Sequence, residues 1–475
     1  MKKQTELVVV SFPVTGHLLV MIELAKRLIN HDHRRRIDTV TILLWKIPFA
    51  PHADIFAQSL IASEPRIKLT SLPEIREPPP LELFHKASEA YILESVKKIA
   101  PLVRDALSAI VSSSSESVRV VGLLLDFFCV PLVDVGNELD LPSYVFLTCS
   151  SGFLSMMKYL PERHRNIPSE FDRSSGDEEL PIQGYVSSVP TKVLPPGLFV
   201  RESYKAFVEL AEKFHYAKGI LVNSFSELQP HGFDYFGRLE SYPKVYPVGP
   251  ILSLKDRPNP NQDAAERERI MRWLDGQPES SVVFLCFGSF GIHGGPQLKE
   301  IAQALELVGC KFLWSIRTNP TEETSPYGHL PDGFTDRTAA QGIVSGWAPQ
   351  VEVLAHKAIG GFVSHCGWNS ILESLWFGVP IATWPMYAEQ QLNAFTMAKE
   401  LGLAVELRLD YVSSQGEMVA ADEIARAVRS LMDGGDGRRE KVKEMAEGAR
   451  KAVMDGGSSF SAITSFIGDL TVVDS

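Results

Sequence analysis

The sequence predicts an α/β protein with two doubly wound domains, each built on a parallel sheet. Apolar runs of strand length alternate with amphipathic stretches of helical length, which is the pattern of βα units. The strand runs are continuous Val/Ile/Leu segments, as expected for strands covered on both faces. The chain has 475 residues, too many for one ordinary core, and the pattern occurs twice.

The first series of elements fills the N-terminal half. We expect residues 1–248 to form one Rossmann-like domain, beginning with a strand and an amphipathic helix over residues 18–30. Strands are predicted at residues 7–12, 39–44, 120–125 and 143–147.

The second series begins near Ser280, and we expect residues 279–455 to form the second Rossmann-like domain. A helix is predicted over residues 296–308. Strands are predicted at residues 281–287, 311–316, 342–345, 361–364 and 379–383. Two such sheets that face each other create a ligand cleft at the carboxyl ends of their strands.

The remaining segments connect these domains. Residues 249–278 are rich in Pro, Asn and charge, which is typical of an interdomain linker. Residues 456–475 form a tail, and its Phe460, Ile463 and Phe466 are suited to dock on the first domain.

Composition excludes several classes of function. The net charge of −11 argues against nucleic acid as a partner, because phosphate backbones require basic surfaces. We interpret the basic run Arg34-Arg35-Arg36 as a solvated helix end or turn. Five cysteines without CxxC spacing indicate buried free thiols in a reducing compartment. Neither a signal peptide nor a membrane-spanning stretch is visible, so we expect a cytoplasmic protein. We also expect it to be a monomer.

Trp347 opens the most informative segment. It follows a predicted strand and precedes Ala348-Pro349-Gln350, where the proline pre-sets a turn that can present the indole to a planar base. Gln350 offers amide groups to a base or ribose. Trp347 alone would be interpreted as a core aromatic, and the motif that follows it reverses that interpretation.

The next motif, Ser364-His365-Cys366-Gly367-Trp368-Asn369-Ser370, ends a strand and opens a helix. Glycine at 367 allows close approach of a ligand, and the N–H groups of a helix N-terminus bind diphosphate readily. Glu373 lies four residues after Asn369 on the same helix face, where a carboxylate can accept hydrogen bonds from ribose hydroxyls. The alternative is a helix capped by Asn369 and Ser370, which leaves His365, Trp368 and Glu373 together unexplained.

Two further elements complete this region. Glu389 and Gln390 begin a helix after a strand, and their acidic and amide groups suit a hydroxyl-rich sugar; alone they would be a solvated helix start. Ser289 ends the first strand of the second domain in Phe287-Gly288-Ser289, from where its hydroxyl can reach phosphate.

His17 and Asp126 are the candidate catalytic pair. Both follow strands at the carboxyl edge of the first sheet, and the GxGxxG pattern of dinucleotide sites is absent. A lone His at a helix start is usually structural, but Asp126 lies in an apolar run and needs a partner. Neutral His17 can take the proton of a hydroxyl acceptor while Asp126 fixes its tautomer.

These residues resemble a known family. The segment 347–390 resembles, from end to end, the signature box of plant secondary-product UDP-glycosyltransferases. The Phe287-Gly288-Ser289 turn, Gly16-His17 and Asp126 fit the same family, so the resemblance covers essentially the whole chain. It implies a GT-B fold, two facing Rossmann-like domains with the cleft between them.

The resemblance also implies roles for the site residues and a mechanism. It implies inverting transfer from an α-linked UDP-sugar, with UDP-glucose as co-substrate and neither a cofactor nor a metal. Gln390 favours glucose, and Thr148 resembles the family's sugar-contacting threonine. The implied roles are stacking on uracil by Trp347; base contacts by Ala348 and Gln350; diphosphate binding by His365, Asn369, Ser370 and Ser289; ribose binding by Glu373; and sugar contacts by Trp368, Glu389 and Gln390.

Two positions depart from the family pattern. Val20 stands where many relatives have Pro, which makes the helix start less rigid. The stretch from Phe290 to Gly295 also differs, so the shape of the phosphate loop is left open.

The first domain is expected to bind the acceptor, a flavonoid, another phenolic or a terpenoid. Aromatic lining suits such molecules. Each candidate residue is individually more typical of plain core: Phe12, Phe84, Tyr91, Phe127, Phe128 and residues 194–199.

Two other functions compete: a non-catalytic UDP-sugar binder, which would not need both His17 and Asp126, and a nicotinamide oxidoreductase, which would need GxGxxG. Transfer to carbon or nitrogen also stays open.

Overall fold

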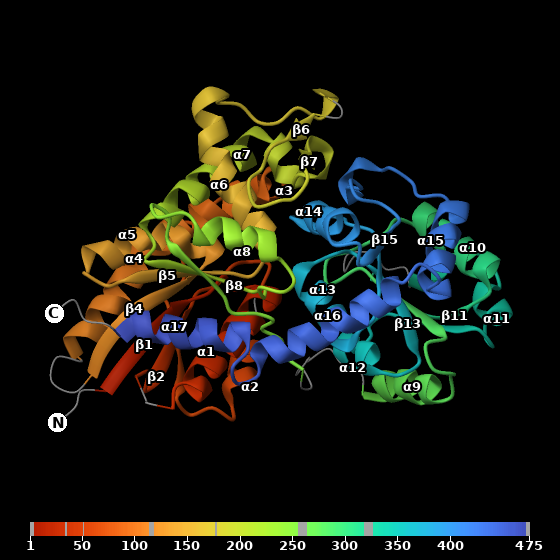
Figure 1. Cartoon of the computed structure of the whole chain (residues 1–475), viewed down its shortest axis with the longest axis horizontal. Coiled ribbons are helices and arrows are strands. Elements are labelled where there is room, and N and C mark those ends of the chain that lie inside the picture. The colour runs from red at the N-terminus through yellow and green to blue at the C-terminus, as the bar shows by residue number, and fades with distance from the viewer. Residues whose placement is uncertain are drawn as a thin grey trace.

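The computed structural model describes residues 4–33, 36–50, 52–113, 118–175, 178–254, 264–317 and 326–471. Arg34 and Arg35 of the basic run, residues 255–263 of the expected linker and residues 472–475 of the tail lie outside this part. The described residues form two parallel sheets, each with helices on both faces, set side by side (Figure 1). The predicted α/β class with two doubly wound sheets is confirmed.

The N-terminal sheet has the strand order β3-β2-β1-β4-β5-β8-β9, and every neighbouring pair is parallel. Its strands are β1 (Gln4–Val10), β2 (Thr39–Leu44), β3 (Ile67–Ser71), β4 (Val118–Asp126), β5 (Ser143–Leu147), β8 (Gly219–Val222) and β9 (Lys244–Pro247). Strands β3, β8 and β9 were not predicted.

The contacts of β1 explain why its sequence is one apolar run. Leu7 and Val9 pack in the cluster that includes α1 (Thr15–His31), whereas Val8 and Val10 pack on the other face, against α4 (Ser88–Ser113). Successive side chains of a strand point to opposite faces, so a strand covered on both sides must be apolar throughout. The other helices of this half are α2 (Ala53–Ile61), α3 (Leu81–Lys86), α5 (Val133–Glu138), α6 (Ser151–Asn166), α7 (Arg201–Lys213) and α8 (Pro230–Gly237).

The C-terminal sheet has the order β12-β11-β10-β13-β14-β15 and is also parallel. Its strands are β10 (Val282–Cys286), β11 (Lys311–Ser315), β12 (Gly342–Ser345), β13 (Ile359–Ser364), β14 (Ile381–Thr383) and β15 (Ala404–Glu406). Its helices include α10 (Gly295–Val308), α11 (Phe334–Arg337), α12 (Gln350–Ala355), α13 (Trp368–Phe377), α14 (Gln390–Phe395) and α15 (Ala421–Asp433). A short antiparallel pair, β6 (Glu179–Leu180) and β7 (Val189–Pro190), lies in the N-terminal half.

Helix α9 (Ala264–Asp275) occupies the second half of the expected linker. Arg267 binds Glu352 on α12 through two hydrogen bonds, and Ile270 and Leu274 are buried. This part of the segment therefore packs on the C-terminal half.

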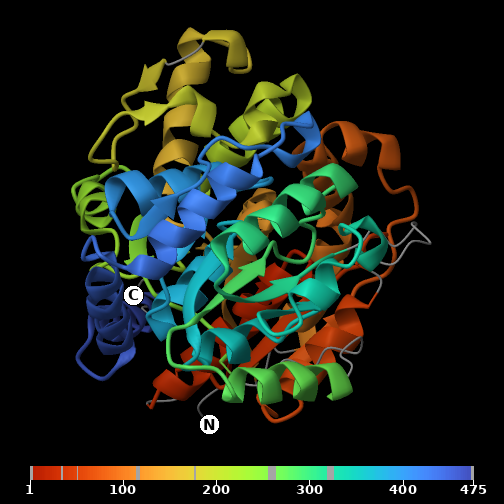
Figure 2. The ribbon, with the colours of Figure 1, turned by 90° about the vertical axis from the view of Figure 1, so that its right-hand side faces the viewer.

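The chain ends by returning to its beginning. Helix α16 (Arg438–Val453) covers α13, and α17 (Ser458–Thr471) then runs along the N-terminal half (Figures 1 and 2). Phe466 meets Tyr144 of β5 and Tyr246 of β9 edge to face, with ring centroids 5.0 and 5.6 Å apart. Apolar docking of this tail thus ties the two halves together.

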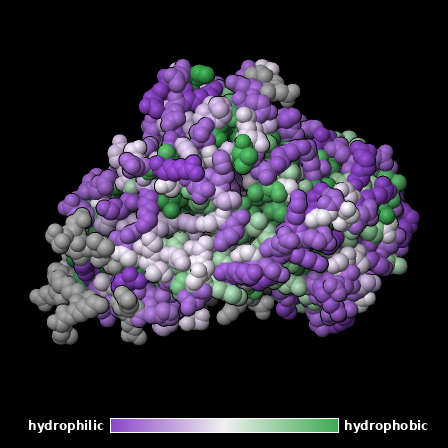
Figure 3. Space-filling view, in the orientation of Figure 1, coloured by the Kyte–Doolittle hydropathy of each residue, from purple (hydrophilic) through white to green (hydrophobic). Residues whose placement is uncertain are grey.

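The visible surface is mainly hydrophilic, with apolar side chains gathered near the junction of the two halves (Figure 3). None of the described helices is both long enough and apolar enough to cross a membrane.

Candidate active site

His17 and Asp126 are in direct contact. His17 is the third residue of α1 and follows β1, while Asp126 is the last residue of β4, the neighbour of β1 in the sheet. His17 Nδ1 lies 2.8 Å from Asp126 Oδ2. The other oxygen of Asp126 accepts a hydrogen bond of 3.0 Å from the backbone N–H of Phe128. The fully buried carboxylate is thus held in place on both sides, as a buried charge requires.

The imidazole of His17 remains partly accessible, with 20% of its side chain exposed. Burial by itself lowers the pKa of His17, but the negative charge and hydrogen bond of Asp126, with a contribution from Glu389, raise it overall above its usual 6.5. Because Nδ1 is engaged by Asp126, Nε2 is the nitrogen that can serve a substrate.

On the opposite side, α13 begins at a turn under backbone constraint. Cys366 has φ 61°, an uncommon value for a residue with a side chain, and Gly367 caps the helix. The imidazole of His365 packs between two glycines. A Cβ atom added to Gly288 would lie 2.6 Å from His365 Nε2, and one added to Gly367 would lie 2.5 Å from it, so neither position leaves room for a side chain. Burial lowers the pKa of His365 to about 4, so the imidazole is neutral at pH 7.

Two side chains at the start of α13 bridge the halves. Asn369 Nδ2 donates a hydrogen bond of 3.1 Å to the carbonyl oxygen of Gly16, next to His17. Trp368 Nε1 donates one of 2.7 Å to the carbonyl oxygen of Asn223, which follows β8. Trp368 was expected at the sugar, but its indole is 2% exposed and its N–H is engaged in the interface. Asn223 was not singled out in the sequence, since nothing local distinguishes it.

Gln350, the first residue of α12, forms hydrogen bonds with the first turns of α13. Its Nε2 donates to Ser370 Oγ at 2.9 Å and to Glu373 Oε2 at 2.7 Å. Glu373 is buried on α13, Ala348 is buried, and Trp347 is half-buried in the turn after β12. Gln350, expected at the base, and Glu373, expected at the ribose, are therefore in direct contact.

Glu389 follows Ala388, which has φ 54°, so this turn is also constrained. Burial raises the pKa of Glu389, which lies close enough to His17 to interact with it across the interface. Asn393, which the sequence reasoning missed, donates to Glu389 Oε1 at 3.2 Å and to the carbonyl oxygen of Cys366 at 3.1 Å. Its i,i+4 spacing from Glu389 was the signal available.

Gln390 is buried, and its Oε1 accepts hydrogen bonds from the backbone N–H groups of Met386 and Tyr387 at 2.9 and 3.1 Å. Its amide N–H groups are the remaining donors, and one of them interacts with the Tyr387 hydroxyl. Thr148 is buried just after β5, and Ser289 is exposed just after Gly288, which has φ +76°.

The candidate acceptor residues divide into two groups. Phe12, Phe127 and Phe128 surround His17, with ring centroids 5.7, 6.0 and 5.4 Å from its ring. Phe84 stacks on Phe49, with centroids 4.4 Å apart, and meets the edge of Tyr91. Phe12, Phe127 and Tyr91 are almost fully buried core residues, as the alternative interpretation expected.

Phe128 and Phe84 are only half-buried and remain candidates. The segment 194–199 ends at Phe199, which lines a cavity of about 730 Å³. The same cavity is lined by Phe171 of the N-terminal half and by Val412 and Gln415 of the C-terminal half. In the described part of the chain, no three His, Cys, Asp or Glu side chains converge as metal ligands would.

Comparison with known proteins identifies relatives along the whole chain. Residues 250–433 match the family described as UDP-glucoronosyl and UDP-glucosyl transferase. The chain is 70% identical to UDP-glycosyltransferase 71C3 of Arabidopsis thaliana over 99% of both chains. It is 66% identical to the flavonol 3-O-glucosyltransferase UGT71C4 of the same plant, over 99% of this chain and 98% of the relative. The crystal structure of Medicago truncatula UGT71G1 complexed with UDP-glucose superposes with a TM-score of 0.91 at 47% identity, covering 99% of each chain.

Proposed function

Because this chain belongs to the plant secondary-product UDP-glycosyltransferases, we propose that it transfers glucose from UDP-glucose to a hydroxyl group of a small lipophilic acceptor, with inversion. The contact between His17 and Asp126 is the observation that carries the proposal, because a protein that only binds a UDP-sugar has no need of it. A flavonoid is the first acceptor to consider, since a relative 66% identical is named a flavonol 3-O-glucosyltransferase. Other phenolics and terpenoids are the further candidates.

In the proposed mechanism, His17 is the general base. Nε2 accepts the proton of the acceptor hydroxyl, whose oxygen forms a bond to C1 of the sugar as the bond from C1 to the diphosphate oxygen breaks. The proton remains on His17, and Asp126 stabilises the imidazolium. Inversion follows from attack on the face opposite the leaving UDP.

The C-terminal residues bind the donor in this proposal. Trp347 stacks on uracil, with Ala348 and Gln350 at its edge, and Glu373 accepts hydrogen bonds from ribose hydroxyls. His365, Asn369, Ser370, Ser289 and the N–H groups at the start of α13 bind the diphosphate. Because His365 is neutral without ligand, it acts first as a hydrogen-bond donor to the leaving diphosphate.

Glu389, Gln390 and Thr148 contact the sugar. The engaged oxygen of Gln390 supports a donor role for its amide nitrogen toward sugar hydroxyls. The indole N–H of Trp368 is hydrogen-bonded to the carbonyl oxygen of Asn223, so we propose that Trp368 contacts the sugar through its backbone.

We also propose the domain assignment that the sequence suggested. Residues 1–248 bind the acceptor, residues 249–278 connect, residues 279–455 bind the donor, and residues 456–475 return to the first domain, as the packing of α17 supports. We also propose a cytoplasmic location, with which the five free cysteines are consistent, and a monomeric state.

The experiment that tests the proposal measures UDP release from UDP-glucose with a panel of flavonols, other phenolics and terpenoid alcohols. We expect acceptor-dependent release that His17→Ala lowers by about 10²–10⁴-fold, the usual range for a general base. The affinity for UDP should barely change. His33→Ala, an exposed histidine just beyond the other end of α1, is the matched control. Full activity in His17→Ala would refute the role of His17, and tight UDP binding without release for any acceptor would favour a binding protein.

A further inference from the structure

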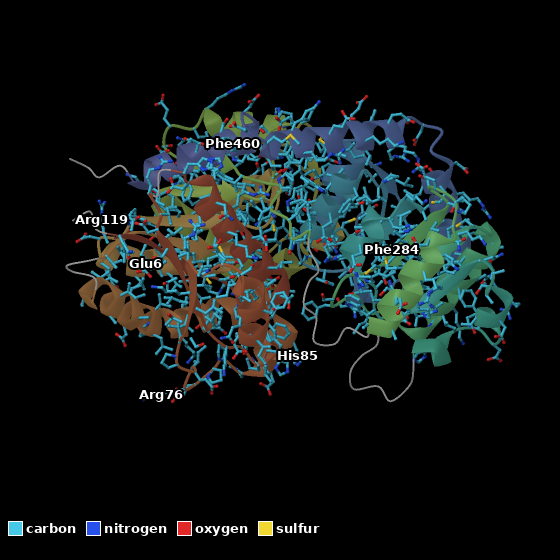
Figure 4. The ribbon with its side chains drawn as sticks, turned by 90° about the horizontal axis from the view of Figure 1, so that it is seen from below. Glu6, Arg76, His85, Arg119, Phe284 and Phe460 are labelled. Carbon is cyan, nitrogen blue, oxygen red and sulfur yellow. The ribbon has the colours of Figure 1, made fainter. Side chains whose placement is uncertain are left out.

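A second cavity lies away from His17 and the donor residues. Its volume is about 810 Å³, and its walls include Arg27 and Asn30 of α1, Leu60 of α2, and Leu252, Val453 and Phe460. Leu252 belongs to the segment that leaves the N-terminal half, Val453 ends α16, and Phe460 lies on α17. Figure 4 shows Phe460 on the C-terminal helical segment that extends along both halves. The cavity thus lies where the chain crosses between the two halves.

Arg27 is the unusual group in this cavity. Its Nη1 atom is buried and has no hydrogen-bond partner among the described residues. Burial lowers the pKa of Arg27 to about 10, against a weaker opposing effect of Glu23. The guanidinium nevertheless stays charged at pH 7. A buried guanidinium nitrogen without a hydrogen-bond acceptor is unfavourable, so the site is suited to an anion that can accept from it.

The neighbouring charges on the cavity wall are already paired. Lys26 binds Glu23 at 2.8 Å, and Glu64 accepts a hydrogen bond of 3.2 Å from Arg66 Nε. His31 contacts Thr464 Oγ1 at 2.7 Å and packs on Phe460, with ring centroids 4.0 Å apart, and burial lowers its pKa. Among the described residues of the cavity wall, Arg27 is thus the cation that forms no salt bridge within 4 Å, and Glu23 interacts with it only from a longer distance.

The rest of the lining is mixed, with six apolar side chains beside the polar Asn30, Ser59, Ser63 and Ser253. Leu60 and Leu252 are 7% and 8% exposed and Ile463 is fully buried at 1%, and they stand beside Val453 and Phe460. A volume of this size accommodates a ligand rather than single waters. One cation beside these apolar side chains matches a ligand with one negative charge and an apolar body.

We propose that this cavity binds an amphipathic monocarboxylate, whose two oxygens accept hydrogen bonds from the guanidinium of Arg27 while its apolar body packs on Leu60, Leu252 and Phe460. A carboxylate suits the site because the planar guanidinium donates two parallel hydrogen bonds to it. The site is separate from the donor and acceptor sites of the proposed function.

The test is isothermal titration of the full-length protein with octanoate, and with 1-octanol as the uncharged probe of the same chain length. We expect octanoate to bind and 1-octanol to bind at least about tenfold more weakly. Arg27→Met should weaken octanoate binding by a similar factor. Arg27→Lys, which keeps the charge but loses the planar fork, should bind with an intermediate affinity. Arg426→Met changes an exposed arginine of α15 and should leave octanoate binding unchanged.

Thermal unfolding without ligand provides an independent check. Arg27→Met should raise the Tm, because it removes a buried charge that lacks a hydrogen-bonded partner. Octanoate binding to Arg27→Met as strong as to the wild type, or no binding to the wild type, would overturn the proposal. A lower Tm in Arg27→Met than in Arg426→Met would also contradict it, since Arg27 would then have a stabilising partner. If Arg27→Met does not fold, equal octanoate affinity of Arg27→Lys and the wild type overturns the proposal.

Discussion

The side-chain amide of Asn369 donates a hydrogen bond of 3.1 Å to the carbonyl oxygen of Gly16, the residue that precedes His17. This bond joins the N-terminus of α13 to the turn that carries the proposed base. An amide nitrogen has two hydrogens, so Asn369 can hold Gly16 and a diphosphate oxygen at the same time. The donor site and the base are thus linked through one side chain.

Replacing Asn369 should therefore affect both binding and catalysis. Asn369→Ala is expected to weaken UDP binding and to lower kcat, each by about 2–10-fold, the range for one hydrogen bond. Asn369→Asp should weaken UDP binding further, because a carboxylate would face both the diphosphate and the Gly16 carbonyl. Titration of UDP and steady-state kinetics measure these effects. UDP affinity in Asn369→Asp equal to that of the wild type would contradict the assignment.

Asp126→Asn should lower kcat/KM and shift its pH profile. The working form of His17 is neutral, so activity falls as the pH drops through the raised pKa of His17. Without the charge of Asp126 burial dominates, the pKa falls, and the acid limb of the profile moves to lower pH. We expect kcat/KM to decrease by about 10²–10⁴-fold because the tautomer is no longer fixed. If the acid limb of the pH profile lies at the same pH in Asp126→Asn and in the wild type, the limb does not reflect the protonation of His17.

Glu373 is expected to distinguish ribose from deoxyribose. The wild type should bind UDP more tightly than 2′-deoxy-UDP, and Glu373→Ala should bind the two about equally. The loss of UDP affinity should be about tenfold, as for hydrogen bonds to a charged group. Gln350→Ala should give a smaller loss, because Gln350 holds the carboxylate. Discrimination that persists in Glu373→Ala would refute the ribose contact.

Gly288 should be required for the donor site. At φ +76°, a Cβ would stand 2.6 Å from His365 Nε2, so Gly288→Ala must displace the imidazole. We expect a loss of UDP affinity of about tenfold or more, on the scale of 1–3 kcal/mol for such strain. Gly309→Ala is the matched control, because Gly309 has a similar φ of +71° but nothing within 4 Å of the added Cβ. Equal UDP affinity in the two variants would contradict the role of Gly288.

His293 should make the protein sensitive to acid. It packs against Phe287 and Trp384, and burial lowers its pKa to about 3, so the folded protein binds fewer protons than the unfolded chain below pH 6.5. The stability is fully present above that pH and is lost as the pH falls toward the folded pKa. His293→Leu should remove about 2 kcal/mol of the loss between pH 7 and pH 5.

The Tm of His293→Leu and the wild type at the two pH values measures this difference. His231→Leu, which changes an exposed histidine of α8, should leave the acid sensitivity unchanged. An unchanged pH dependence in His293→Leu would show that another group is responsible.

Most strands that the sequence predicted have apolar runs of five or more residues, such as β1 and β4, whereas the short β12 and β14 were predicted next to or within the segment from Trp347 to Gln390. Strands β8, β9 and β15 were not predicted, because they have only four, four and three residues and no recognisable motif beside them. Strand β3 was missed because it lies at the sheet edge and exposes most of its side chains.

The sequence by itself determined the two α/β sheets and the family, because apolar periodicity and the segment from Trp347 to Gln390 are local patterns. Only the tertiary structure decided which distant groups meet. His17 and Asp126 are 109 residues apart, Trp368 and Asn223 are 145 apart, and Asn369 and Gly16 are 353 apart. The first contact depends on β1 and β4 being neighbours in one sheet, and the other two on the packing of one half against the other. Such contacts follow from the burial of surfaces distributed over the whole chain, which no local pattern encodes.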